Sequence, residues 1–324
     1  MPRRRTGQLG WADNAVAVAQ ARAKRRDRLN EVDGLFEWAA FDRLLAAIKV
    51  AARGEAAYPW LLMFKVLLLQ RWYDLSDPAM EEALADRLSF RRFVGLALED
   101  DTPDHATIWR FRERLIKEGL IEPLMAELAR QMGQRGVILK HGTLIDATLV
   151  KSAARRPRMS EGQVSPTDPE ARFGANNESR RFEFGYKAHI AVDAGSGLVR
   201  AVRTTPANVQ EIVEAPGLVQ GDEAAVYADR GYDGERLHRH LAERGIANGI
   251  MRRGRRGRAL GPEAVARNHE LSLQRRPVEA VFGTLKRLYR MSRMRHFTLA
   301  RNHLTLSLAC FCYNLRRVHA LIMP

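Results

Sequence analysis

The sequence predicts an all-helical region followed by a larger α/β region. Residues 31–135 carry apolar side chains three and four positions apart, which is the spacing of amphipathic helices. From Val137 onward, short β-branched and apolar runs bounded by glycine, proline and asparagine alternate with further helical stretches. A chain of 324 residues is long enough for two domains. We therefore expect an α/β fold over residues 136–324, a mixed sheet flanked by helices, preceded by an all-helical domain.

The charge of the chain favours nucleic acid as its partner. Lysine and arginine number 53 against 38 acids, which gives a net charge of +15. The longest apolar run, residues 58–69, is interrupted by Lys65 and is shorter than the roughly 20 residues of a spanning helix, so no membrane partner is expected. The N-terminus lacks the apolar core of a signal peptide. Cys310 and Cys312 are expected to be a buried reduced pair, which indicates a cytoplasmic protein.

The first 135 residues contain two candidate DNA-binding parts. Residues 1–30 form an arginine-rich arm, for which a solvated tail and a DNA contact are equally good interpretations. Within 31–135, two capped helix starts with early prolines occur at residues 77–78 and 102–104. Two short helices joined by a turn, the second basic, suit a helix-turn-helix in which Arg110 and Arg112 contact DNA. A plain helical bundle is the alternative.

Asp146 is the first candidate site residue. It lies in the middle of a β-rich run, residues 142–150, where an ionised carboxylate is costly unless it is paired, hydrogen-bonded or bound to a metal. A long basic loop, 151–184, follows, which is expected to be mobile without its ligand. A hairpin then turns at Asp193, which we interpret as a turn residue. His189 projects from this hairpin either as a structural residue or as part of the site.

The second candidate is Asp229, which ends an apolar strand just before a glycine turn. Carboxylates at the carboxyl ends of strands are common in the active sites of open α/β sheets. Asp233 follows in the turn and is better explained as the N-cap of the next helix. Further on, residues 252–258 are too rich in arginine for an ordinary surface and suit a flexible phosphate clamp. Its arginines are Arg252, Arg253, Arg255, Arg256 and Arg258.

The third candidate is Glu279, in a helix expected from Pro277. Glu279 and Lys286 lie seven residues apart, hence on nearly the same line beside the apolar stripe, with Arg275 one turn earlier. After Glu279 the chain has no further acid, while eight lysines and arginines follow. The simpler interpretation is a local pair between Glu279 and Arg275 on a solvated face.

Phosphodiester cleavage explains all three acids together. Carboxylates on separate elements can hold two divalent ions about 4 Å apart, which activate a nucleophile and stabilise the leaving oxygen. Oxygen ligands favour two Mg²⁺ ions, with Mn²⁺ as a substitute. Asp146, Asp229 and Glu279 would be the ligands, and Arg275 and Lys286 would hold flanking phosphates.

Five segments in this order resemble the DDE transposases of bacterial insertion sequences, in particular the insertion-sequence-five group. The resemblance implies a ribonuclease-H-like catalytic domain with Asp146, Asp229 and Glu279 as its metal triad. One departure is Ser272, three residues before Arg275, where the wider superfamily has tyrosine; no tyrosine contact to DNA is expected there. The segments are 146–148, 186–193, 205–209, 228–232 and the pattern Arg275-x3-Glu279-x6-Lys286.

The resemblance implies a reaction and its partners. The protein would bind the terminal inverted repeats of its own element in double-stranded DNA, nick them, and transfer the freed 3′-hydroxyl ends to target DNA. Because one element has two ends, we expect a homodimer or larger assembly, associated with the bacterial nucleoid. The alternatives are a ribonuclease-H-like nuclease or resolvase that only hydrolyses, and a catalytically silent DNA-binding repressor derived from an element.

Overall fold

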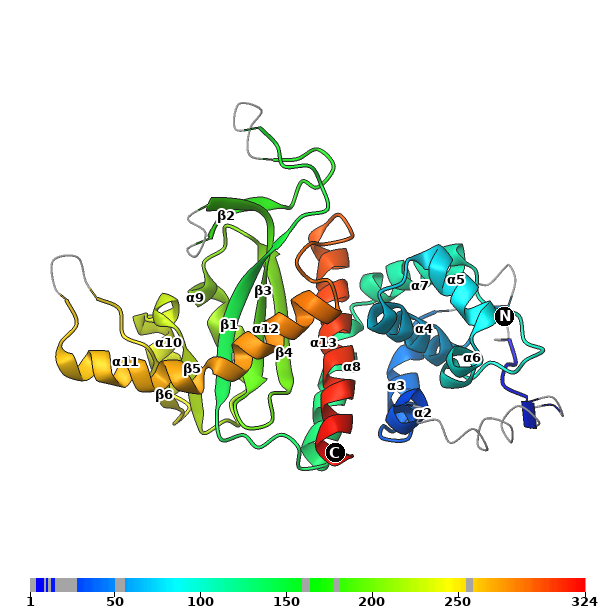
Figure 1. Ribbon diagram of the computed structural model, residues 1–324, viewed down its shortest axis with the longest axis horizontal. Coiled ribbons are helices and arrows are strands. Elements are labelled where there is room, and N and C mark those ends of the chain that lie inside the picture. The colour runs from blue at the N-terminus through cyan, green and yellow to red at the C-terminus, as the bar shows by residue number, and fades with distance from the viewer. Residues whose placement is uncertain are drawn as a thin grey trace. The chain divides into compact units, whose positions relative to one another are not determined.

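The computed structural model describes residues 4–8, 10, 13–14, 28–49, 56–158, 164–176, 181–254 and 259–323. The chain divides into two compact units, Met1–Gln131 with Val318–Pro324, and Met132–Arg317. The described elements of the first unit are helices, and the second unit carries the sheet (Figure 1). Most of the basic arm 1–30 lies outside the described residues. Among the described residues, no helix is both long and apolar enough to cross a membrane.

The helical unit is built around α4, which is apolar on every side and therefore lies in the centre of its core. The one lysine on this helix, Lys65, is buried and is neutralised by Asp33, 2.5 Å away. Its ammonium also lies over the rings of Trp38 and Phe93. The helices are α2 (Arg28–Asp33), α3 (Trp38–Leu45), α4 (Trp60–Tyr73), α5 (Asp77–Asp86), α6 (Leu88–Val94), α7 (His105–Lys117) and α8 (Ile121–Gln134).

Both predicted helix starts of this region are present. The Ser76 hydroxyl caps α5, and the Asp104 carboxylate caps α7 by accepting the Thr107 N–H at 2.6 Å. The two helices are not joined by a turn, however, because α6 and the irregular segment 95–104 lie between them. The expectation of two helices connected directly by a turn was therefore wrong.

The second unit contains one mixed sheet of six strands, as the sequence predicts. Its order is β2-β3-β1-β5-β6, and β4 pairs with the outer edge of β3 beyond β2. β1 is antiparallel to β3 and parallel to β5, and β5 is parallel to β6. The strands are β1 (Thr143–Lys151), β2 (Arg172–Asn176), β3 (Arg181–Asp193), β4 (Val199–Pro206), β5 (Ala225–Ala228) and β6 (Ala247–Ile250).

Part of the segment 151–184, which the sequence predicts to be a loop, belongs to the sheet. β2 and the start of β3 lie within it, and the antiparallel pairing of these two strands satisfies their backbone groups. The preceding part is anchored by the buried carboxylate of Asp168, which accepts hydrogen bonds from Ser152, Tyr186 and the Thr298 N–H. The described part of this segment is therefore attached to the second unit.

Helices cover the sheet and close its edge. Leu237 and Leu241 of α10 (Glu235–Ala242) pack with Ile145 and Val226 in one core cluster. Figure 1 shows α12 (Arg276–Leu288) against β1. α13 (Leu299–Ile322) hydrogen-bonds to β4 through Asn314. α11 (Pro262–Gln274) covers the unpaired edge of β6. Its Arg267 side chain donates hydrogen bonds to two carbonyl oxygens of that strand at 2.8 Å.

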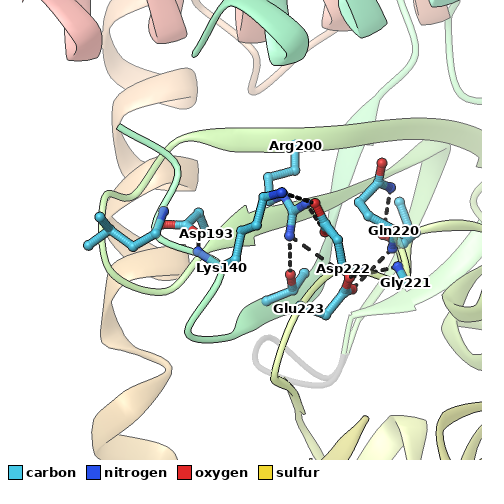
Figure 2. A network of polar contacts seen from close by, with 10 residues as sticks. Lys140, Asp193, Arg200, Gln220, Gly221, Asp222 and Glu223 are labelled. Atoms are coloured by element: carbon cyan, nitrogen blue, oxygen red, sulfur yellow. Dashed lines mark hydrogen bonds and ion pairs between the residues drawn. The ribbon is translucent and has the colours of Figure 1, made fainter. Parts of the chain in front are cut away.

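A satisfied polar network holds the amino ends of β1 and β5. Figure 2 shows Arg200 beside Asp222 and Glu223, with Lys140 and Asp193 nearby. The buried Glu223 carboxylate accepts three hydrogen bonds from the backbone N–H groups of residues 220 to 222. The Asp193 carboxylate accepts hydrogen bonds from the backbone N–H of Lys140, at 2.9 Å, and from the backbone N–H of Ser196 in its own turn. Asp193 is therefore a turn residue, as predicted, and this network is structural.

Candidate active site

The sheet brings the first two candidate acids next to each other. In the parallel pair β1 and β5, Thr143 lies opposite Val226 and Leu144 opposite Tyr227. Asp146 follows Leu144 by two residues on β1, Asp229 follows Tyr227 by two residues just after β5, and the charge of Asp229 acts on Asp146. Side chains alternate along a strand, so Asp146 faces away from the core cluster that contains its neighbour Ile145.

The surroundings of Asp146 disfavour its ionised form. Burial raises the pKa of the Asp146 carboxyl to about 6, and the nearby charges of Asp229 and Glu211 act in the same direction. The Arg275 guanidinium and the N–H of Ala147 oppose this rise in pKa. Three acids thus share one partly buried region, and a cation placed among them would be stabilised.

Arg275 is the cation that pairs with Asp146. It precedes α12, and its Nη2 lies 3.0 Å from Asp146 Oδ2. Its side chain is 11% exposed, and its Nη1 points to the sulfur of Met251. A local pair of Arg275 with Glu279, the simpler interpretation of the sequence, is not what the structure shows, because Arg275 pairs with Asp146 on a strand.

Glu279 lies in the first turn of α12 and is exposed. It follows Arg275 by four residues, which places the two Cβ atoms about 5–6 Å apart along the helix. In the part of the chain that the structure describes, no group of three or more His, Cys, Asp or Glu side chains is arranged to hold a metal ion. The structure thus places Asp229 near enough for its charge to act on Asp146, and it sets Glu279 one turn from the arginine that contacts Asp146.

The donor set nevertheless fits a hard divalent cation. Asp146, Asp229 and Glu279 offer carboxylate oxygens alone, which Mg²⁺ and Mn²⁺ accept. Tyr232 adds a further observation, since its hydroxyl is buried and has no hydrogen-bond partner among the described residues. Burial, followed by the charges of Asp146, Glu211 and Asp229, raises the pKa of Tyr232 well above its usual value.

Glu211 is a residue that the sequence analysis did not single out. It begins α9 (Glu211–Glu214), whose N-cap Gln210 makes no side-chain cap bond. Its Oε1 lies 2.9 Å from Lys187 Nζ. A methyl group added to Gly231 would meet Asp229 Oδ1 at 2.9 Å and Glu211 Oε2 at 3.6 Å, so the two carboxylates flank this glycine. The sequence feature that could have indicated Glu211 is its position two residues after the segment 205–209, one of the five that carry the family resemblance.

The arginine-rich segment begins at the sheet edge. The backbone N–H and carbonyl of Arg252 form hydrogen bonds with the side-chain amide of Asn268. The Arg253 N–H donates to Asp233 Oδ2 at 2.7 Å. Asp233 is therefore not the N-cap of α10, which is Gly234; instead it contacts Arg253, Arg252 and His238. Arg255 and Arg256 lie outside the described residues.

The remaining candidates differ in exposure. Lys286 is exposed on the last turn of α12, and Arg110 is exposed on α7. Arg112 is 5% exposed and donates to both oxygens of Asp77, so its expected role as a DNA contact is replaced by a structural one. His189 is fully buried beside Thr205, and burial lowers its pKa to about 3, so it is a neutral core residue.

Comparisons with known proteins give two family matches and a distant structural likeness. The family model described as "Transposase DDE domain" matches residues 139–315, which is more than half of the chain. A second model, "Transposase domain (DUF772)", matches residues 17–114. Among solved structures, the chain is similar to the piggyBac transposase in a cryo-EM structure of its synaptic complex with hairpin DNA. That match has a TM-score of 0.42 and 11% identity, and covers 91% of this chain and 74% of the other.

Proposed function

The chain belongs to the transposase DDE domain family, and from that premise we propose that it cleaves the ends of an insertion sequence and transfers their 3′-hydroxyl groups to target DNA. The observation that carries this proposal is the parallel pairing of β1, which holds Asp146, with β5, which Asp229 directly follows, with α12 tied to β1 through Arg275. We further propose that the sheet is ribonuclease-H-like and that the element belongs to the insertion-sequence-five group, as the sequence motifs suggest.

Three carboxylates would hold the catalytic cations. Asp146 and Asp229 come from neighbouring strands, and Glu279 comes from the first turn of α12. Two Mg²⁺ ions, or Mn²⁺ in their place, would supply Lewis-acid stabilisation of the attacking and leaving oxygens. The pairing of β1 with β5 and the ion pair between Arg275 and Asp146 support this assignment.

Basic side chains near the acids would position the DNA. Arg275 forms an ion pair with Asp146 in this structure, and a divalent ion on Asp146 would free its guanidinium to bind a phosphate oxygen. Lys286 lies exposed two turns after Glu279 on α12, in reach of a second phosphate. Arg252 and Arg253 follow the edge strand of the sheet. We propose that the arginines of 252–258 bind the phosphate backbone of the DNA.

The proposed partners are the two ends of one element and a target duplex. Holding two ends at once requires at least two catalytic units, so we propose a homodimer or larger complex on DNA. Arg110, exposed on α7 within the region matched by the second transposase model, is the residue of the helical unit that we propose for contact with the element ends.

The test is cleavage and joining of DNA. Purified protein is incubated with labelled DNA that carries the sequence flanking its gene and with a supercoiled target, in Mg²⁺ or in EDTA, beside Asp229→Asn. We expect joined products that require the metal and are absent with the variant. Nicks without joining would indicate the hydrolytic nuclease, and binding without cleavage would indicate the silent repressor.

A further inference from the structure

We propose that Glu211 is an additional carboxylate of the catalytic cation site, and that Lys187 is its counterion when no divalent ion is bound. This inference rests on the proposed function, because it concerns the same site as Asp146 and Asp229. It goes beyond a three-acid centre by assigning a fourth acid from a different element, α9.

The position of Glu211 supports the assignment. α9 packs against the turn 230–232 that follows Asp229, and Glu211 Oε2 and Asp229 Oδ1 approach Gly231 together. The charge of Glu211 acts on Asp146 along with that of Asp229. Glu211 is thus within electrostatic reach of both strand acids, although it is remote from Asp146 in sequence.

A second, independent observation indicates that a ligand belongs in this region. The Tyr232 side chain is 1% exposed, and its hydroxyl makes no hydrogen bond within the described part of the chain. A buried hydroxyl without a partner is costly. The charges of Asp146, Glu211 and Asp229 act on the same hydroxyl and, after burial, raise its pKa. A water molecule bound to a cation among these acids would give the hydroxyl a partner.

Two protein cations already form ion pairs with the acids of this region. Arg275 pairs with Asp146 at 3.0 Å, and Lys187 pairs with Glu211 at 2.9 Å while also donating to the Val209 carbonyl. The Lys187 side chain is 10% exposed, so its ammonium is held in place. Asp229 forms no ion pair among the described residues. The arrangement is that of a cation site in which lysine and arginine balance the acids until a divalent ion binds.

Mn²⁺ binding to the full-length protein without DNA tests this inference. The test variant is Glu211→Gln, and its matched control is Glu214→Gln, the same substitution on the same helix at a residue that pairs with Arg203. Titration calorimetry gives the affinity, and thermal unfolding checks that each variant folds. We expect Glu211→Gln to weaken Mn²⁺ binding about 10–100-fold, and Glu214→Gln to change it less than about 2-fold.

A double variant separates ligation from an indirect effect of Lys187. If Glu211 only neutralised Lys187, then Lys187→Met combined with Glu211→Gln would restore Mn²⁺ affinity. We expect the double variant to remain weak. If Glu211→Gln does not fold, then Glu211→Asp, which keeps the charge and shortens the side chain, should still weaken Mn²⁺ binding.

The outcomes separate this inference from the proposed function. Normal Mn²⁺ binding by Glu211→Gln, together with its loss in Asp229→Asn, would overturn the role of Glu211 and leave the metal centre intact. Unchanged binding in both variants would remove the metal centre itself. Restoration in the double variant would overturn the assignment of Glu211 as part of the site.

Discussion

Arg275 Nη2 lies 3.0 Å from Asp146 Oδ2, so the helix that carries Glu279 is attached to the strand that carries the first acid of the site. The two residues come from elements far apart in sequence, and their side chains are 11% and 20% exposed. At this low exposure an ion pair is screened less than on an open surface. The pair therefore helps to set the position of α12 on the sheet.

Replacing Arg275 by alanine should destabilise the protein by about 1–3 kcal/mol, because Asp146 would lose its charged partner while remaining mostly buried. The control is Arg276→Ala, the next residue, which is exposed and should change stability by less than about 0.5 kcal/mol. Urea unfolding measures both. Mg²⁺ should restore more stability to Arg275→Ala than to the parent protein, and equal losses in the two variants would contradict this account.

Replacing Arg112 by alanine should cost about 3–5 kcal/mol, since it removes one partner of a buried ion pair with Asp77. Arg110→Ala on the exposed side of the same helix serves as the matched control and should have little effect on stability. Thermal and denaturant unfolding distinguish them. A stable Arg112→Ala variant with weakened DNA binding would reinstate Arg112 as a DNA contact.

Stability should fall in mild acid because of His189. Its pKa is about 3 in the folded protein against 6.5 in the unfolded chain, so the unfolded state takes up the proton first. The contribution of His189 to the free energy of unfolding therefore decreases as the pH falls from 6.5 toward 3, by about 2 kcal/mol between pH 6.5 and 5, while the raised pKa of Asp146 acts in the opposite direction. His189→Gln should flatten this part of the stability profile. An unchanged slope would show that His189 is not the responsible group.

Gly174→Ala should disturb the pairing of β2 with β3. An added methyl group would lie 2.4 Å from the Ala207 carbonyl oxygen, so the backbone must shift, at a cost of about 1–3 kcal/mol. Gly133→Ala provides the contrast, because it lies in α8 with open space around it and should stabilise the helix by roughly 0.5–1 kcal/mol. Equal effects of the two substitutions on unfolding would contradict the close approach at Gly174.

Features with local causes could be predicted from the sequence. The cap at Asp104 and the strand that ends on Asp229 each depend on a few neighbouring residues, and both are present. The mixed sheet flanked by helices is confirmed, and the family match confirms a DDE transposase.

Features that depend on distant partners could not be predicted. Arg112 resembles a DNA-binding arginine until its partner, 35 residues earlier, is known. β2 has only five residues, and its short alternation of Phe173 and Ala175 does not identify a strand until its pairing with β3 is known. Glu211 looked like an ordinary first-turn acid, and only the folding of α9 beside Asp229 gives it a place near the site.

Strand transfer from a pre-cut end tests the central claim most directly. A labelled duplex that ends in the terminal repeat and carries a free 3′-hydroxyl is incubated with target plasmid, protein and Mg²⁺, beside the same duplex with a 3′-deoxy end. The account predicts labelled plasmid from the 3′-hydroxyl duplex alone, lost in EDTA and in Asp146→Asn. A protein that cuts DNA with Mg²⁺ but never joins the 3′-hydroxyl end to the plasmid would contradict the account.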